Sequence, residues 1–378
     1  MDVPHAPRLT VGARPIGSGA PSFIIAEIGT SHGGELAAAR EMVERAAEAG
    51  ADCVKFQLVI AEEIVHPLTG LVDLPGGAIP LYERFRALER PIDFYAELKK
   101  HAEGCGLHFL CTPFGPKSAR LLEEIGVESF KIASPELNYD ELLRQVGSYA
   151  RPVILSSGVS TLGDIEHALE LVGRSSCALL HCITAYPAPP EEYNLRVIPA
   201  MESLFGVPVG LSDHSRDPVL VPTLAAAMGA RAIEKHMALS RQGGGLDDPI
   251  AVTPDELREM VLAVRLAERE GFEATTRRLA AGYGEATIDS VLGTGVKALA
   301  PSERANYATT NRSIHAVRGL PRGTRLAPAD LAVLRTEKKL RPGLPPALLP
   351  AILGKRLTRD VPSGEGIEWD DLLQAGDD

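Results

Sequence analysis

Two histidines whose placement suits a metal site end two successive apolar runs in the second half of the chain. His214 directly follows the run at residues 208–213, and His236 ends the run at residues 232–236. If these runs are adjacent parallel strands, the two imidazoles lie at the same height, and with a carboxylate they can hold a divalent cation. The residues alone leave a second interpretation open, in which the pair only supports its neighbours or belongs to the core.

A second group of polar residues is suited to bind an anion. Lys55 and Lys131 lie in apolar runs, where an unpaired ammonium group would be costly to bury. Hydroxyl groups at the ends of the runs would complete a site for a phosphate. These hydroxyls belong to Ser134, Ser156 and Ser212. Any one of these serines, taken alone, is more often a turn or cap residue.

A carboxylate closes the first apolar run. Glu27 follows Ile24, Ile25 and Ala26. Such a group can complete a metal site or act as a general acid or base. A helix cap is the alternative interpretation.

The elements that must position these residues are eight short apolar runs, each with a polar end. They cover residues 23–27, 53–57, 108–112, 130–134, 152–156, 177–181, 208–213 and 232–236. Amphipathic stretches such as 35–49 and 254–270 separate them, with a capping box predicted at Thr253, Pro254 and Glu256. The alternation predicts the α/β class and a (β/α)8 TIM barrel, whose strand ends share one pocket. A doubly wound sheet is disfavoured because no glycine fingerprint follows the first run.

The length of 378 residues exceeds one barrel and predicts a second module. We expect a catalytic barrel domain at 1–280, in which 1–20 form an N-terminal extension or hairpin. A linker at 281–310 is rich in Gly, Ala, Ser and Thr. A small β-rich domain follows at 311–378.

Composition narrows the classes of partner. The formal net charge of −11 opposes binding to nucleic acid or to an anionic membrane. No stretch resembles a signal peptide or a membrane span. Five cysteines without a CxxC pair favour reduced thiols and a cytoplasmic location. Cys111 and Cys182 fall near strand ends, and we expect both to be core residues.

The polar strand ends and several other segments resemble the sialic acid synthases, which condense phosphoenolpyruvate with amino sugars. The resemblance begins at Glu27, Gly29, His32 and Gly34 and keeps its order over about 340 residues. It continues through EAGADCVKFQ (48–57), KIASPEL (131–137), ILSSGVS (154–160), residues 181–190 with Tyr186, VGLSDH (209–214), IEKH (233–236) and the linker run 292–306. Arg312 and Ser313 then open a module that resembles the antifreeze-like (SAF) domain of this family.

The resemblance implies a reaction and a role for each matching residue. His214 and His236 would hold a divalent metal, with manganese expected first and magnesium or cobalt as alternatives. Lys55, Lys131 and the three serines would bind phosphoenolpyruvate, and Glu27 would serve the water that adds during the reaction. The product would be a nine-carbon 2-keto sugar acid, with phosphate released by C–O cleavage. Glu136, Tyr186 and Asp247 match positions that line the sugar site.

The resemblance also implies an assembly. The small domain would reach over the barrel of a second subunit in a domain-exchanged homodimer, where Arg312 would contact the N-acyl group of the sugar. Other basic residues of the small domain would form its solvated face. They are Arg322, Arg325, Lys338, Lys339, Arg341, Lys355 and Arg356.

Several positions depart from the family pattern, mostly on the sugar side. They are Ser31, Gly33, Ala185, Asp248 and Asn311. The acceptor is therefore open among N-acetylmannosamine, a diacetylated 6-deoxy sugar leading to legionaminic or pseudaminic acid, and a less common aldose. Two other functions compete: a related condensing enzyme for an aldose phosphate, and a sugar-binding protein without turnover.

Overall fold

The computed structural model describes residues 8–74 and 77–372, and its centre is a barrel of eight parallel strands. Neighbours follow the order β7-β4-β3-β12-β11-β10-β9-β8. β7 and β8, the ends of this order, are consecutive strands of the barrel and lie in contact, so the sheet nearly closes. The strands are β3 (Phe23–Gly29), β4 (Cys53–Leu58), β7 (His108–Pro113), β8 (Phe130–Ile132), β9 (Val153–Ser156), β10 (Cys177–Cys182), β11 (Val209–Asp213) and β12 (Ala232–His236). The predicted TIM barrel is confirmed.

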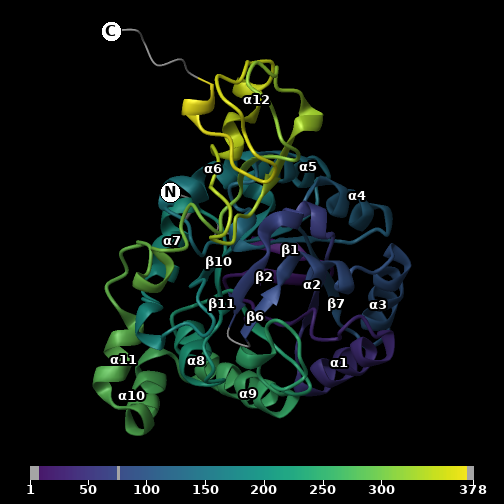
Figure 1. Cartoon of the computed structure of the whole chain (residues 1–378). Coiled ribbons are helices and arrows are strands. Elements are labelled where there is room, and N and C mark those ends of the chain that lie inside the picture. The colour runs from purple at the N-terminus through teal and green to yellow at the C-terminus, as the bar shows by residue number, and fades with distance from the viewer. Residues whose placement is uncertain (1–7, 75–76, 373–378) are drawn as a thin grey trace.

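Helices form an outer ring around these strands (Figure 1). The ring contains α1 (Leu36–Ala49), α3 (Ile92–Gly104), α4 (Pro116–Glu124), α5 (Asp140–Ser148), α6 (Leu162–Val172), α7 (Val197–Phe205), α8 (Leu220–Ala227) and α9 (Pro254–Glu270). The capping box of α9 forms as predicted, since the Thr253 N–H donates to Glu256 Oε2 at 2.8 Å. α10 (Phe272–Tyr283) and α11 (Glu285–Leu292) lead away from the barrel. None of the helices within the described ranges is long and apolar enough to cross a membrane.

The connection from β4 to β7 carries an insertion that becomes one wall of the site. It contains two short 3₁₀ turns, the hairpin of β5 (Leu71–Leu74) and β6 (Gly77–Pro80), and α2 (Leu81–Leu88). Its apolar side chains, among them Ile64, Leu81 and Phe85, form a separate small core. The insertion therefore has its own packing and does not depend on the barrel core alone.

The barrel interior is apolar at one end and polar at the other. A hairpin of β1 (Arg8–Val11) and β2 (Arg14–Gly17) closes the apolar end, where Leu9, Val11 and Ile16 pack against inward-facing barrel residues. Side chains alternate along a strand, so the inward position after Ile25 on β3 is Glu27. The same alternation brings polar groups to the opposite, C-terminal end of the barrel.

The small domain lies over one side of the barrel's C-terminal end (yellow in Figure 1). It contains β13 (Ser313–Ala316), β14 (Leu331–Leu334) and α12 (Leu349–Ile352), around its own core of residues such as Ile314, Leu326 and Ile367. Residues 1–7 of the predicted extension and 373–378 of the predicted small domain lie outside the described residues.

The linker is fastened to the barrel strand ends by buried polar groups. Glu303, which is fully buried, accepts hydrogen bonds from the N–H groups of Val159 and Thr184, both at 2.8 Å. Lys297 donates to the carbonyl of Ser157 at 3.0 Å. The linker is thus part of the barrel rim, which limits where the small domain can lie.

We predict that Ile16→Ala lowers the free energy of unfolding by about 2–5 kcal/mol. Ile16 is fully buried in the β1–β2 hairpin that closes the barrel, and its truncation leaves a cavity that the neighbouring side chains cannot fill. Denaturant unfolding followed by circular dichroism measures this. Leu204→Ala is the matched control, since Leu204 is 60% exposed and its truncation should cost little. Equal losses for both variants would contradict a packing role for the hairpin.

Candidate active site

A cavity of about 730 Å³ opens at the C-terminal ends of the barrel strands. Ten of the residues predicted from the sequence line it. They are Glu27, Lys55, Lys131, Ser134, Ser156, Tyr186, Ser212, His214, His236 and Asp247. Such a volume is in the upper part of the range of about 300–1,000 Å³ for ligand pockets, so it has room for two small substrates.

Four charged side chains form the floor of this cavity. Lys55 Nζ lies 2.8 Å from Glu27 Oε2 and 3.7 Å from Glu234 Oε2, and Lys131 Nζ lies 3.8 Å from Glu234 Oε1. Each of the four side chains is at most 5% exposed. Two ammonium groups and two carboxylates therefore share one largely dry volume, in which each needs the others to offset its desolvation.

The two floor carboxylates differ in their affinity for a proton. Burial raises the pKa of Glu27, and the nearby Glu234 carboxylate adds to this, although Lys55 opposes it. Burial acts in the same direction on Glu234, but Lys131 and Lys55 outweigh it and lower its pKa. Glu234 is thus the ionised partner of the two lysines, and Glu27 is the carboxyl group poised to exchange a proton.

The three predicted serines border the same floor. Ser156 Oγ accepts a hydrogen bond from Lys131 at 2.6 Å, and Ser212 Oγ donates to Glu234 Oε1 at 2.9 Å. Ser134 Oγ accepts from the N–H of Gly158 at 3.0 Å, which leaves its proton free to point elsewhere. Hydroxyls and ammonium groups therefore meet as the sequence predicted.

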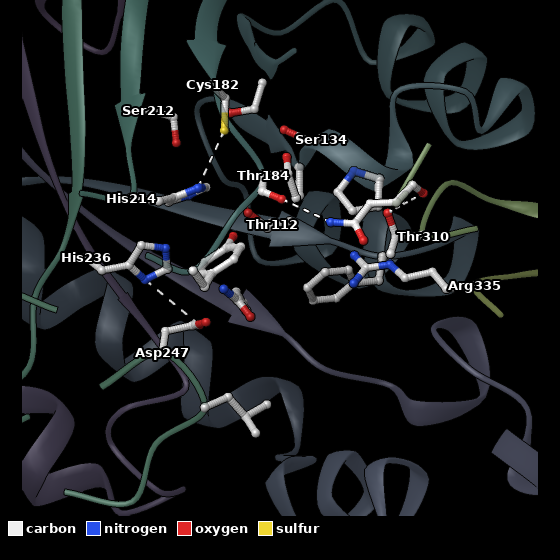
Figure 2. A pocket seen from close by; sticks show the side chains of 18 of the residues that line it. Thr112, Ser134, Cys182, Thr184, Ser212, His214, His236, Asp247, Thr310 and Arg335 are labelled. Carbon is white, nitrogen blue, oxygen red and sulfur yellow. Dashed lines mark hydrogen bonds and ion pairs between the residues drawn. The ribbon is translucent and has the colours of Figure 1, made fainter. Parts of the chain in front are cut away.

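The two imidazoles lie beside the floor with their rings 5.4 Å apart (Figure 2). His214 Nδ1 is 2.8 Å from the carbonyl of Ile183, and a carbonyl only accepts, so Nδ1 carries a proton and Nε2 is the unprotonated nitrogen of the neutral ring. Tyr186 stacks on the His214 ring at 4.3 Å. His236 Nδ1 lies 3.9 Å from the Asp247 carboxylate.

This donor set fits a divalent cation that also binds substrate. Within the described part of the chain, no three His, Cys, Asp or Glu side chains are grouped closely enough to hold a metal by themselves. His214 and His236 would supply two nitrogen ligands, and Asp247 stands nearby. Burial and the charge of His214 lower the pKa of His236 well below its ordinary value, which keeps it in the neutral form that a metal needs.

The pKa of His214 is shifted in the opposite direction from that of His236. Burial lowers the pKa of His214, but the Cys182 thiol group 3.8 Å from Nδ1 and the Ile183 carbonyl outweigh it and raise the pKa to about 9. A cation at Nε2 would have to displace a proton. Cys111 and Cys182 are both buried, as expected for core cysteines, and Cys182 also borders the cavity.

Two predicted site residues are not brought to the cavity. Glu136 and Arg312 are both buried and pair with each other, with Arg312 Nη2 2.8 Å from Glu136 Oε1. Arg312 also donates to the carbonyls of Phe114 and Glu63. In this structure Arg312 holds the small domain to the barrel of its own chain, and it is not itself among the residues that line the cavity.

The small domain instead contributes Arg335 to the cavity. Its guanidinium group lies across the cavity from His214 and His236, near Thr310 (Figure 2), and donates to Glu136 at 2.6 Å. Lys338 and Lys339 are exposed, as expected for the solvated face of the small domain, and both also line the cavity. They lie in the turn after β14, beyond Glu337, and no pattern in the sequence indicates the direction of that turn.

Other lining residues were recognisable but not selected. Gln57, Thr112 and Glu234 occupy inward positions on β4, β7 and β12: Thr112 and Glu234 lie two residues beyond inward apolar residues, and Gln57 lies two residues beyond Lys55. Because side chains alternate along a strand, extending the inward-facing positions of each strand to its end would have identified these residues. Gln57 donates to Glu27 Oε1 at 2.7 Å and helps to hold the carboxylate that the sequence did identify.

The departures from the family pattern mostly lie away from the cavity lining. Only Ala185 is among the lining residues. Asp248 is buried and accepts from the N–H of Gly245 at 2.7 Å, and Asn311 bridges the linker to the carbonyl of Val159 at 3.1 Å. Ser31 and Gly33 belong to the turn after β3. These four positions therefore shape loops.

Comparison with known proteins agrees with this geometry. The chain is 34% identical to the spore coat polysaccharide biosynthesis protein SpsE of Bacillus subtilis over 96% of each chain. It is 32% identical to N,N'-diacetyllegionaminic acid synthase of Legionella pneumophila, over 96% of this chain and 97% of that one. The crystal structure of the Bacillus subtilis protein superposes with a TM-score of 0.82, covering 98% of this chain and all of that one.

Two family profiles divide the chain. The SAF domain profile matches residues 311–373, the small domain, and the NeuB family profile matches residues 42–273 of the barrel. The NeuB match alone spans more than half of the sequence. The chain belongs to the NeuB family of sialic and related nonulosonic acid synthases and carries a C-terminal SAF domain.

Proposed function

We propose that this protein is a nonulosonic acid synthase that condenses phosphoenolpyruvate with an open-chain N-acylated amino sugar. The observation that supports this most directly is one cavity with two buried ammonium groups at its floor and two imidazoles beside them. The floor suits the trianionic enol ester, and the imidazoles suit a cation next to a carbonyl oxygen.

Phosphoenolpyruvate binds at the floor. Lys55 and Lys131, with the hydroxyls of Ser134, Ser156 and Ser212, hold its phosphate and carboxylate. Fixing the enol ester beside the sugar makes a bimolecular encounter effectively unimolecular. The buried position of the lysines strengthens each contact, because little water competes.

A divalent cation, with manganese the first expectation, would be held by His214 and His236 and would supply Lewis-acid activation of the sugar aldehyde. The vinyl carbon of phosphoenolpyruvate forms the new C–C bond with the aldehyde carbon, which leaves a cationic carbon at the enol position. Tyr186 and Asp247, on the same side of the cavity, contact the sugar hydroxyls.

Glu27 acts on the water that completes the reaction. Water adds to the cationic carbon and gives its proton to the Glu27 carboxylate, whose raised pKa suits this role near neutral pH. The adduct then loses phosphate with cleavage of the C–O bond, giving the 2-keto acid. Gln57 and Lys55 orient the carboxylate through its two oxygens.

The acceptor belongs to the family's range of free or modified N-acyl amino sugars, with N-acetylmannosamine as the first candidate. We also propose a homodimer in which the small domains exchange, since an exchange would re-form between subunits the contacts that Arg312 and Glu136 make within one chain. All five cysteines have free thiols, which accords with a reducing cytoplasm.

We expect the purified protein to release phosphate only when phosphoenolpyruvate, a divalent cation and an amino-sugar aldehyde are all present. A phosphate-release assay with product mass measurement tests this. Arabinose 5-phosphate and erythrose 4-phosphate serve as control acceptors. Release with these controls but with no amino sugar would replace the proposal by the aldose-phosphate alternative.

Glu27→Gln should lower turnover by about 10²–10⁴-fold, because the amide cannot accept the proton, while phosphoenolpyruvate still binds through the lysines. Stopped assays and calorimetric titration of phosphoenolpyruvate measure the two effects. Glu285→Gln, an exposed glutamate on α11, is the matched control and should behave as wild type. Wild-type turnover in Glu27→Gln would refute the role.

Affinity for Mn²⁺ should rise with pH up to about 9, by about tenfold per pH unit, because binding displaces one proton from His214 while His236 is already neutral. Titration calorimetry at three pH values, in buffers of different ionisation enthalpy, measures affinity and proton release. His236→Ala should lose metal retention, and His167→Ala, on the outer helix α6, should keep it. A pH-independent affinity would contradict this ligand set.

Mixing two inactive variants tests the exchange. Arg312→Ala weakens the closing of the small domain, and Glu27→Gln inactivates the barrel. If domains exchange, a mixed dimer contains one intact barrel covered by one intact small domain, so activity returns on mixing and re-assembly. No recovery, with mixed dimers verified by native mass spectrometry, would show that each domain covers its own barrel.

A further inference from the structure

A buried ion pair that the proposed reaction does not use lies directly behind the two imidazoles. Asp213, at the end of β11, immediately precedes His214. Lys235 immediately precedes His236 on β12 and is in register with Asp213. Lys235 Nζ lies 2.6 Å from Asp213 Oδ2, and the two side chains are 1% and 0% exposed. Side chains alternate along a strand, so this pair faces away from the cavity while both histidines line it.

The Asp213 carboxylate uses both of its oxygens in hydrogen bonds. Oδ1 accepts from the hydroxyl of Tyr193 at 2.6 Å and from the N–H of Ser215 at 2.8 Å. Oδ2 accepts from Lys235 at 2.6 Å and from the hydroxyl of Ser215 at 3.0 Å. Lys235 also donates to the carbonyls of Ser215 and Asp217. A buried ion pair adds little net stability, but these directional bonds define one arrangement of the two strand ends.

Tyr193 connects the ion pair to the main chain of His214. Its hydroxyl, fully buried, donates to Asp213 and accepts from the His214 N–H at 2.7 Å. The ladder between β11 and β12 ends at Asp213, one residue before His214. His236, by contrast, still pairs in register with Glu27 of β3. The ion pair and Tyr193 thus supply for one imidazole the fixed main chain that strand pairing supplies for the other.

The loop after β10 holds both His214 and the tyrosine. The Ile183 carbonyl lies 2.8 Å from the His214 ring, and the N–H of Ala188 donates to the His214 carbonyl at 3.1 Å. Tyr193 is fixed in the same loop by His181, whose Nε2 donates to the Tyr193 carbonyl at 2.6 Å. The Tyr193 hydroxyl is therefore presented by an anchored residue, and its removal should leave these other contacts in place.

We propose that Tyr193, Asp213 and Lys235 are positioning residues that set the separation of the two imidazoles, and with it the affinity of the site for a divalent cation. This rests on the metal site in the proposed function. The rings of His214 and His236 are 5.4 Å apart and come from neighbouring strands (Figure 2). Because a shared cation needs both nitrogens at once, a shift of one ring weakens the site as a whole.

The phosphoenolpyruvate side of the cavity has contacts of its own. Lys131 donates to Ser156 at 2.6 Å, and Lys55 lies 2.8 Å from Glu27. Loss of the Tyr193 hydroxyl leaves these contacts unchanged. We therefore expect the loss to lower the affinity for the cation and not the affinity for phosphoenolpyruvate, a difference that a general loss of folding would not produce.

The experiment removes one hydroxyl, by Tyr193→Phe, and titrates the metal-free full-length protein with Mn²⁺ by calorimetry in the absence of substrates. We expect the affinity to fall by about 10–100-fold, the usual effect of losing a group that orients a metal ligand. Tyr95→Phe is the matched control. Tyr95 is 1% exposed and donates to the carbonyl of Gln57 at 2.9 Å, so its variant also loses one buried hydroxyl but should keep the wild-type affinity.

A second variant tests the ion pair and keeps the tyrosine hydroxyl. The double variant Asp213→Asn, Lys235→Met removes both charges together, so no lone charge stays buried, and the amide oxygen can still accept from Tyr193. We expect weaker Mn²⁺ binding here too, because the two strand ends are no longer tied. Denaturant unfolding of all three variants shows that each is folded.

The outcomes separate this inference from the metal site on which it rests. Wild-type Mn²⁺ affinity in Tyr193→Phe, an equal loss in Tyr95→Phe, or a parallel loss of phosphoenolpyruvate affinity overturns the positioning role and leaves the metal site standing. If the wild type binds none of Mn²⁺, Mg²⁺ and Co²⁺, the metal site fails and this inference fails with it. Neither titration depends on turnover, so the identity of the sugar does not affect the result.

Discussion

The four charged side chains buried at the floor constrain the rest of the site. Lys55, Lys131, Glu27 and Glu234 lie in a volume with almost no exposure, where any one of them alone would be strongly destabilising. The set is tolerable because each ammonium faces a carboxylate and the carboxylates can share a proton. An anionic substrate bound at this floor, as proposed, would disturb this balance, and we expect a proton shift at Glu27 in response. The same electrostatics would then couple binding to proton transfer.

The β1–β2 hairpin, the linker and the small domain limit the access of water to this floor. The hairpin seals the apolar end of the barrel, so water reaches the lysines only from the cavity side. On that side, Glu303 and Lys297 tie the linker to the strand ends, and Arg312 with Glu136 holds the small domain in place. In the proposed reaction, a dry floor would strengthen the contacts to phosphate and carboxylate and would protect the cationic intermediate from stray water. The linker run is accordingly as much a part of the site as the strand ends.

The sequence predicted the barrel and most of the floor because both follow from local rules. Apolar runs with polar ends indicate buried parallel strands, and a closed barrel brings their ends together. The same reasoning did not predict the pairing of Glu136 with Arg312 or the approach of Lys338 and Lys339 to the cavity. Their positions depend on how a second domain docks, which is decided by contacts between distant residues, such as Glu136 and Arg312, which are 176 positions apart. No periodicity in the sequence encodes that contact.

The floor and the opening of the cavity differ in how well they tolerate substitution. The floor residues are coupled by burial, so replacing one of them leaves its partners with an uncompensated charge. The residues around the acceptor come from loops and from the small domain, and Lys338, Lys339 and Tyr186 retain solvent contact. A substitution there, such as the alanine at 185, alters the shape or charge of the opening at little cost to stability. Under the proposed function, one barrel can thus keep its site for phosphoenolpyruvate while the small domain and the loops adapt the opening of the cavity to a different sugar.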